Sequence, residues 1–247
     1  MKRTTKILLA IVGVLVVAVI ILAAWARVSV GNVLEETGDG RSGVELTGTR
    51  IERSFDVGEF TGIEVRGGWR VTVVQGAEAS VAVTADKALM DRITVERSGD
   101  TLELGAREWV LDHDARLEAE VTVPSLSRFV VRGGADARIR GFSGNELSVE
   151  VAGAADIDGE NNRFEQLNLT VEGAGDLDFA TSSAVNAMVT LDGAGNVDLT
   201  MAGGELTGSI GGVGSVTYGG EVSREAIRVD GVGSVEGTVE AVGAVQK

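Results

Sequence analysis

Aspartate side chains recur at regular intervals in the second half of the chain, and they are the residues best suited to chemistry. Two sets lie two positions apart: Asp136, Asp156 and Asp176, and then Asp158, Asp178 and Asp198. Within each set the spacing is constant, at about 20 residues, which is in the range of a stacked repeat. Carboxylate oxygens held close together bind hard cations such as Ca²⁺. The first set, Asp136, Asp156 and Asp176, is therefore a candidate Ca²⁺ site.

A structural role for these carboxylates is the alternative. Short Asp, Asn and Ser side chains accept hydrogen bonds from nearby backbone N–H groups at turns, and the second set would then simply face solvent. Glycine-rich repeats that bind calcium have a much shorter period and a Gly-Gly-x-Gly-x-Asp spacing, which the Asp sets here do not share. The spacing favours the structural role, so we expect no cofactor, with Ca²⁺ as the alternative.

A second candidate site lies between Arg107 and Arg116. His113 is the only histidine of the chain, and it stands between Asp112 and Asp114, a few residues after Trp109. An aromatic side chain on a projecting loop stacks on sugar rings or anchors a protein partner. His113 would then act as a pH-sensitive or metal contact. The alternatives are a tryptophan that closes the core and a solvated histidine, and no catalytic residue is expected.

The first Asp set belongs to a short phrase that occurs six times, as in Gly173-Ala-Gly-Asp-Leu177. The first glycines of the copies are Gly133, Gly153, Gly173, Gly193, Gly212 and Gly231, and the last two intervals are one residue shorter than the others. Before each glycine, apolar and polar residues alternate, as in Leu147-Ser-Val-Glu-Val151. Alternation with period two predicts a strand with one buried face. A nearly fixed period of this length predicts a fold that stacks one unit on the next.

A repeat of this length, with a strand, a glycine corner and a second strand, fits one coil of a parallel β-helix. Equivalent residues of successive coils would lie about 4.8 Å apart and form aliphatic columns inside. A sandwich of hairpins would not explain why residue types stay in register over six copies. We therefore predict an all-β fold, a parallel β-solenoid with about 20 residues in each coil.

The N-terminus predicts a membrane connection. Residues 7–26 are an uninterrupted apolar run that follows Lys2, Arg3 and Lys6. As a helix, a run of this length spans about 30 Å, the thickness of the hydrocarbon core of a bilayer. Basic residues before such a helix stay in the cytoplasm, so the rest of the chain would be exported. Ala24-Trp-Ala26 also fits a signal-peptidase site, and secretion after cleavage is the alternative to a single-pass anchor.

The chain then divides by pattern. Residues 1–27 are the signal anchor or signal peptide, 28–50 a tether, 51–124 irregular first coils with a short helix or turn, 125–240 the regular solenoid and 241–247 a tail. A solenoid end exposes unpaired strand edges. No capping element is recognisable at the C-terminal end, which makes it a candidate for partner contact or self-association.

Composition limits the classes of function. The chain has 247 residues, no cysteine and a formal net charge of −15. The absence of cysteine excludes disulfides and Cys-ligated zinc. An acidic surface repels phosphate backbones, so a nucleic-acid partner is not expected.

Several segments together resemble the bacterial head-GIN domain family of auto-transporter adhesin heads, formerly a domain of unknown function. The resemblance covers residues 50–237 and rests on Ser54-Phe55-Asp-Val-Gly-Glu-Phe60, on Ala85-Asp86 before Ile93-Thr-Val95 and Thr101-Leu-Glu-Leu104, on Val121-Thr-Val-Pro124-Ser-Leu126, and on the Gly-Ala-Gly-Asp phrases that follow. It implies an envelope-associated, right-handed β-helix and brings no established catalytic or ligand residues.

These observations predict a non-catalytic, envelope-associated β-helix module for adhesion or for protein or glycan binding. One alternative is a carbohydrate-active enzyme, because β-helices can carry clustered acidic residues in a groove. An active site needs a cluster whose members have separated pKa values, whereas these columns repeat without variation. The other alternative is a structural envelope component that self-associates.

Overall fold

The computed structural model describes residues 46–106 and 117–238, most of which lie in strands. The predicted membrane segment at 7–26, the loop 107–116 with its candidate site and the residues from 239 onward lie outside the described residues. Within the described ranges, no helix is both long enough and apolar enough to cross a membrane.

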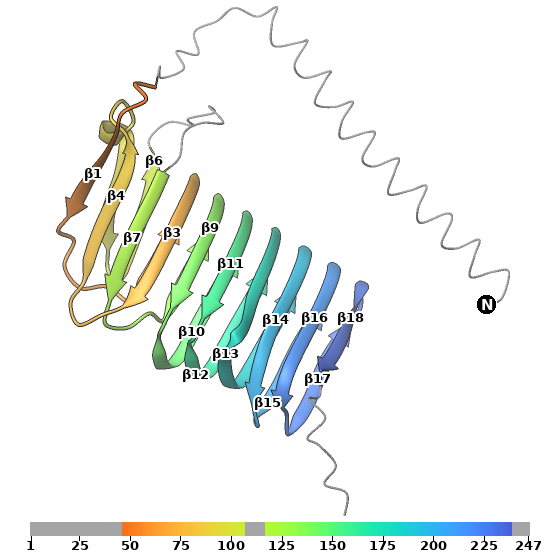
Figure 1. Cartoon of the computed structure of the whole chain (residues 1–247). Coiled ribbons are helices and arrows are strands. Elements are labelled where there is room, and N and C mark those ends of the chain that lie inside the picture. Colours follow the sequence, from red (N-terminus) through yellow and green to blue (C-terminus); the bar gives the residue numbers. More distant parts are fainter. Residues whose placement is uncertain (1–45, 107–116, 239–247) are drawn as a thin grey trace, which may run out of the picture. The chain divides into compact units, whose positions relative to one another are not determined.

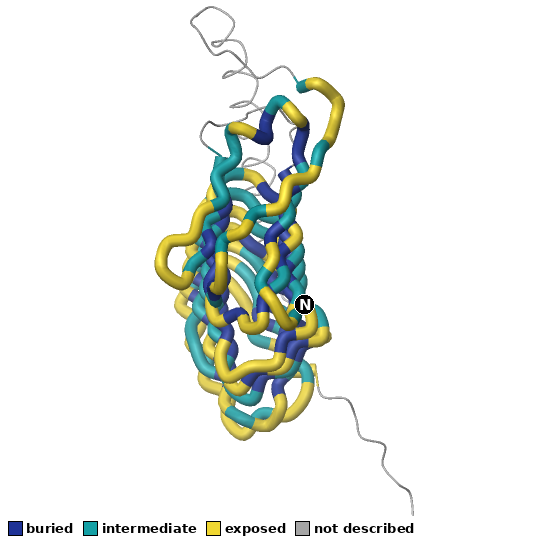
Figure 2. The backbone as a smooth tube through the Cα atoms, turned by 90° about the vertical axis from the view of Figure 1, so that its left-hand side faces the viewer, coloured by how far each residue is buried: buried dark blue, intermediate teal, exposed yellow. Residues whose placement is uncertain are grey.

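The strands hydrogen-bond into one continuous sheet that winds into a flattened coil with two faces (Figures 1 and 2). We call one of them the Asp face. In spatial order it consists of β1 (Arg50–Phe55), β4 (Ser80–Asp86), β7 (Leu117–Val123), β3 (Gly68–Gln75), β9 (Gly134–Arg140), β11 (Ala154–Glu160), the first part of β13 (Ala174–Leu191), β14 (Ala194–Ala202), β16 (Val213–Glu221) and β18 (Val232–Thr238).

The opposite face is built in the same way. In spatial order it consists of β5 (Ile93–Ser98), β6 (Thr101–Ala106), β2 (Gly62–Val65), β8 (Arg128–Val131), β10 (Ser143–Val151), β12 (Arg163–Val171), the second part of β13, β15 (Glu205–Ile210) and β17 (Arg224–Val229). Because β13 is long, it bends from one face to the other and pairs with neighbours on both.

The prediction of an all-β solenoid is confirmed, with about 6 turns. From β8 onward the pairing is parallel, and apart from one register shift between β13 and β14 it keeps equivalent residues together, for example Val151 with Val171 and Val171 with Leu191. These three side chains are fully buried. The aliphatic columns run from coil to coil, with an interruption at Gly208 in one of them, so each coil covers the apolar surface of the next. The hydrophobic effect therefore stabilises the stack as a whole and not its single units.

The repeated glycines stack directly on one another at one corner. A Cβ atom on Gly153 would lie 1.9 Å from the carbonyl oxygen of Gly133, and the later glycines of the repeat meet the same obstacle. The N–H of Ala154 donates to that same carbonyl at 2.8 Å. The corner therefore requires glycine because the neighbouring backbone approaches too closely for any side chain.

The opposite corner holds a buried polar network centred on Asn162. Its Nδ2 donates to the carbonyl oxygen of Ile139 at 2.8 Å and to the hydroxyl of Ser182 at 3.0 Å. Its Oδ1 accepts a hydrogen bond from the N–H of Phe142 at 2.9 Å. Backbone groups that lose a strand partner at the turn are thus satisfied by side chains, as buried polar groups must be.

The first coils are not stacked in the order of the sequence. Strands β2 and β3 lie between β6 and β7 on one side and β8 and β9 on the other. The remaining N-terminal strands run antiparallel to their neighbours: β1 with β4, β4 with β7, and β5 with β6. The short 3₁₀ helix η1 (Met90–Arg92) follows Asp86, whose carboxylate accepts hydrogen bonds from the N–H of Ala88 and the hydroxyl of Thr47.

The last coil leaves part of the core uncovered by described residues. Val229 is 42% exposed, although the equivalent Ile210 is fully buried. Tyr218 packs over Gly237 and donates a hydrogen bond from its hydroxyl to Glu225. Tyr218 and Glu225 thus introduce polar groups into the apolar columns at this end. The hydrogen bond to Glu225, with smaller effects of burial and charge, raises the pKa of Tyr218.

Candidate functional site

The predicted column of Asp136, Asp156 and Asp176 is present on the Asp face. The parallel register places these residues on β9, β11 and β13 directly beside one another. The second column is present as well, but its Asp158 has Arg138 as one neighbour and Asp178 as the other. Outward-facing carboxylates on adjacent strands repel one another, by about 1 kcal/mol per pair in water at this kind of distance.

The acidic column is neutralised at its N-terminal end by Arg70. Arg70 on β3 is in register with Asp136, and its Nε lies 3.0 Å from Oδ2 of Asp136. The sequence analysis missed this residue because β3 is far from the repeats in the chain. Gly67-Gly68-Trp69-Arg70-Val71 nevertheless has the spacing of the repeated phrase, and the corner column of glycines does begin at Gly67.

At its C-terminal end the column becomes a ladder of hydrogen bonds. Asp176 Oδ1 accepts from both the backbone N–H and the side-chain Nδ2 of Asn196, each at 2.9 Å. The hydroxyl of Ser215 donates to Asn196 Oδ1 at 2.8 Å. A structural role for the Asp column predicts contacts of this kind, because the carboxylate oxygen of Asp176 accepts hydrogen bonds from the next coil.

Asp156 lies in the middle of the column, and the pKa of its carboxyl is raised. Partial removal from water is the largest cause, followed by the negative charges of Asp158, Asp136 and Asp176. A shallow hollow of about 380 Å³, lined largely by Ala and Gly, adjoins Asp156 and Asp176. Across the two described ranges, no three Asp, Glu or His side chains are grouped so as to hold a metal ion.

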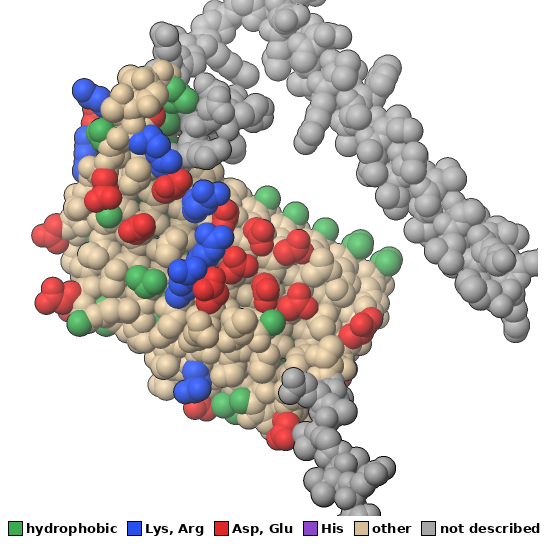
Figure 3. Space-filling view, viewed as in Figure 1, with side chains coloured by type: hydrophobic (Ala, Val, Ile, Leu, Met, Phe, Trp, Pro, Cys, Tyr) green, Lys and Arg blue, Asp and Glu red, His purple; other side chains and the backbone are tan. Residues whose placement is uncertain are grey.

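Charge is unevenly distributed over the Asp face (Figure 3). Basic side chains gather over β3 and β9, where Arg138 and Arg140 have carboxylate partners on β11 at 3.6 and 3.0 Å. Acidic side chains predominate from β11 onward (Figure 3). These exposed ion pairs each contribute little to stability, so their main effect is to set the surface charge that a partner would meet.

The second predicted site is not described. Trp109, Asp112, His113 and Asp114 all fall within 107–116, outside the described residues, and binding through them stays a prediction. Another tryptophan, Trp69, is 4% exposed and therefore belongs to the core, and its Nε1 donates to the carbonyl oxygen of Arg66 at 3.1 Å.

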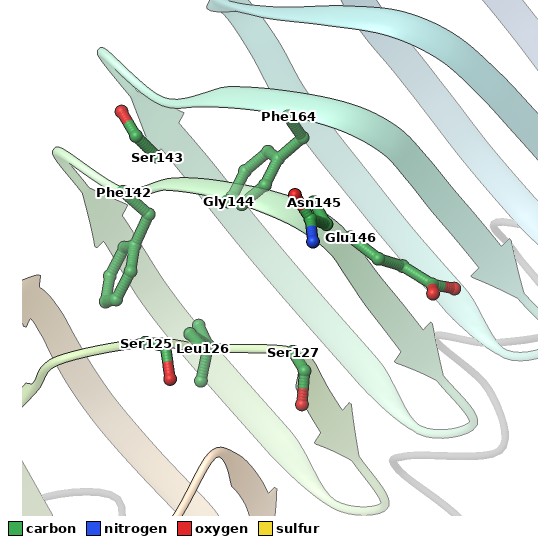
Figure 4. Close-up of a pocket in the computed structure, with 9 residues that line it drawn as sticks. All are labelled: Ser125, Leu126, Ser127, Phe142, Ser143, Gly144, Asn145, Glu146 and Phe164. Atoms are coloured by element: carbon green, nitrogen blue, oxygen red, sulfur yellow. The ribbon is translucent and has the colours of Figure 1, made fainter.

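A further hollow lies at the corner opposite the glycines. Pro124 to Ser127 leads directly from β7 into β8, whereas in the next coil the first part of β10 makes a wider corner. Pairing of β10 with β8 begins at Ser148, so β12 is the one described strand that pairs with residues 143–147. The step between the two coils leaves a pocket of about 240 Å³ (Figure 4).

The pocket has an apolar floor and a polar rim. Phe142, Phe164 and Leu126 form the floor and are 1%, 2% and 4% exposed. Gly144 is in register with Phe164, and a Cβ on Gly144 would lie 3.8 Å from the Phe164 ring. The absence of a side chain at Gly144 therefore keeps the pocket open. The rim consists of Ser125, Ser127, Ser143, Asn145 and Glu146, all exposed.

Three of the rim side chains have free hydrogen-bonding capacity. Ser127 donates to the carbonyl of Thr61, and Glu146 accepts from Asn168 Nδ2. The side chains of Ser125, Ser143 and Asn145 make no hydrogen bond to any residue in 46–106 or 117–238. Sequence reasoning did not find this pocket, because the only signal is the single glycine at 144 in an otherwise apolar position.

The continuous columns, the parallel register and the glycine corner define the protein as a β-solenoid. The family model described as "Putative auto-transporter adhesin, head GIN domain" matches residues 59–198, more than half of the chain. The protein therefore belongs to this family, and the resemblance seen in the sequence is confirmed.

Solved structures support the fold. A protein described as a "putative adhesin" from Bacteroides fragilis superposes with a TM-score of 0.63 at 16% identity, over 79% of this chain and 100% of that one. A "putative adhesin" from Parabacteroides merdae gives a TM-score of 0.50 at 16% identity, over 78% and 97% of the two chains. At these identities the likeness concerns the fold alone. The search of curated proteins gave no match.

Proposed function

We propose that the protein is a non-catalytic adhesion module of the bacterial cell envelope that binds a protein or a glycan through its outer surface. The observation that carries this proposal is the regular display of short polar side chains on successive strands of a stiff stack. Asp176, Asn196 and Ser215, for example, project from three adjacent strands in register. Such a surface offers many closely spaced hydrogen-bonding groups without a reaction centre.

We further infer that residues 7–26 anchor the chain in the cytoplasmic membrane and that the solenoid is exported. The basic residues before the apolar run support this orientation, and secretion after cleavage at Ala24-Trp-Ala26 is the alternative. A right-handed coil is the expected hand, because parallel strands joined by a crossover are almost always connected in that sense.

The experiment compares two strains, one that produces the full chain and one that produces residues 1–45 alone. Cells of each strain are applied to immobilised glycans and envelope proteins, and the cells that are retained are counted. We expect retention only of the strain with the full chain. Equal retention of both strains would contradict the proposal. Release of reducing ends or unsaturated products from acidic polysaccharides by the purified full chain would favour the enzyme alternative instead.

A second candidate function is self-association through the C-terminal end of the stack. Val229 is partly exposed there, and β17 and β18 each have a described strand neighbour on one side only. Unpaired strand edges are templates for pairing with another chain. Sedimentation of the full chain in detergent should show an oligomer at high concentration, and Val229→Lys should reduce it. A monomer at every concentration would exclude this function.

A further inference from the structure

We propose that the pocket between Ser125–Ser127 and Ser143–Glu146 binds a single neutral saccharide ring. The inference rests on the proposed function, because it assigns one subsite to a surface that contacts glycans. The pocket is built from the corners of two adjacent coils, so its shape is set by the stack and not by a free loop (Figure 4).

The size of the pocket limits the ligand. Sites for drug-sized ligands usually measure about 300–1,000 Å³, and this pocket measures about 240 Å³. It is therefore suited to one ring of a larger glycan rather than to an oligosaccharide held along its length. The rest of the glycan would extend past the open side, where the exposed rim residues lie.

The chemistry of the lining matches the two-sided character of a sugar. A pyranose ring has C–H groups on its faces and hydroxyl groups around its edge. Phe164, Phe142 and Leu126 provide apolar contact on the floor. Asn145 on the rim supplies donors and acceptors that no described residue uses, whereas the hydroxyl groups of Ser125 and Ser143 point away from the floor (Figure 4).

The charge of the rim favours a neutral sugar. Among the described residues, Glu146 is the only charged one that lines the pocket. One of its oxygens accepts a hydrogen bond from Asn168, and the carboxylate retains further acceptor sites for sugar hydroxyls. The same charge would repel a uronic or sialic acid carboxylate.

Two other occupants fit less well. An acyl chain would cover the floor but would gain no hydrogen bonds from the hydroxyl and amide groups of the rim. A peptide strand added to β10 would need a longer free edge, since β8 already pairs with β10 from Ser148 to Val151. A saccharide ring satisfies both the floor and the rim.

The experiment measures saturation transfer by NMR from the full chain, in a detergent without a sugar head group, to dissolved glucose, galactose, mannose, N-acetylglucosamine and glucuronate. We expect transfer to at least one neutral sugar and weaker transfer to glucuronate. Gly144→Val should fill the pocket and weaken binding of that sugar at least tenfold. A Cβ at Gly144 makes only ordinary contacts, so this variant should fold.

Gly68→Val is the matched control. It introduces the same side chain on β3, where nothing lies within 4 Å of a Cβ atom, and it should leave binding unchanged. Asn145→Ala should weaken binding about fivefold through the loss of one hydrogen bond. Folding of each variant is checked by its melting curve.

Three results would overturn the proposal: no saturation transfer to any neutral sugar, transfer that Gly144→Val leaves intact, or a pocket that binds octanoate or a tripeptide in preference to every sugar. The cell-retention experiment separates this failure from that of the proposed function. If cells with Gly144→Val are retained as well as wild-type cells, the pocket does not bind the glycan, and the adhesion function is still supported. If wild-type cells are not retained either, the adhesion function itself fails.

Discussion

The carbonyl oxygen of Gly153 occupies the space that a Cβ atom on Gly173 would need, at 1.9 Å from the ideal Cβ position. The carbonyl oxygen of Gly133 blocks a Cβ atom on Gly153 in the same way. A side chain at any one of these positions would push two coils apart along the whole corner. The stack therefore depends on glycine here for close approach of backbone.

Gly173→Ala should destabilise the protein by about 3 kcal/mol or more, because the obstacle is backbone that cannot rotate away. Urea denaturation of wild type and variant measures the difference. Gly68→Ala, with open space around its Cβ, should change stability by less than about 0.5 kcal/mol. Equal effects at the two positions would show that glycine stacking is not the cause.

Asn162→Ala should cost about 3 kcal/mol, because it leaves the N–H of Phe142 and the carbonyl of Ile139 buried without partners. The control is Asn168→Ala, which removes side-chain hydrogen bonds with Glu146 and Gln166 near the surface and should cost about 1 kcal/mol. Chemical denaturation serves for both. If Asn162→Ala lowers the free energy of unfolding as little as Asn168→Ala does, water has replaced the hydrogen bonds of the Asn162 amide.

Asp156→Asn should raise the melting temperature at about pH 7 and have little effect at about pH 3. Because the pKa of Asp156 is raised in the folded state, the folded protein binds the proton more tightly than the unfolded chain does. Stability therefore falls as pH rises between the ordinary pKa of Asp and the raised one, and Asn removes that loss. Asp56→Asn is the control, because Asp56 is exposed and its substitution changes the net charge by the same amount as Asp156→Asn. The interpretation fails if Asp56→Asn gives the same gain.

Millimolar Ca²⁺ or EDTA should leave the melting temperature of the full chain unchanged to within about 1 °C. The reason is that Asp136 is paired with Arg70 and Asp176 already accepts two hydrogen bonds from Asn196. A rise of several degrees with Ca²⁺ that Asp156→Asn abolishes would instead establish the cation site predicted as the alternative.

Much of the regular solenoid could be predicted from the chain alone. The nearly constant interval between the glycine phrases and the alternation in Leu147–Val151 carry the fold, because a parallel ladder repeats the same contact at every coil. The stacking of Asp136, Asp156 and Asp176 followed from the same periodicity. By contrast, the ion pair between Arg70 and Asp136 joins residues from coils that are adjacent in space but 66 positions apart, an interval that does not fit the 20-residue period.

The amino-acid sequence by itself determined which residues face inward, where the glycine corner lies and that coils must stack to bury their apolar faces. Those properties are periodic and local, so they are visible in residue types and spacing. Only the tertiary structure decided the order of the first coils, the step in width between the Pro124–Ser127 corner and β10, and the pocket that results. These depend on which strand edges meet, and edge pairing through backbone hydrogen bonds is nearly independent of the side chains that the sequence displays.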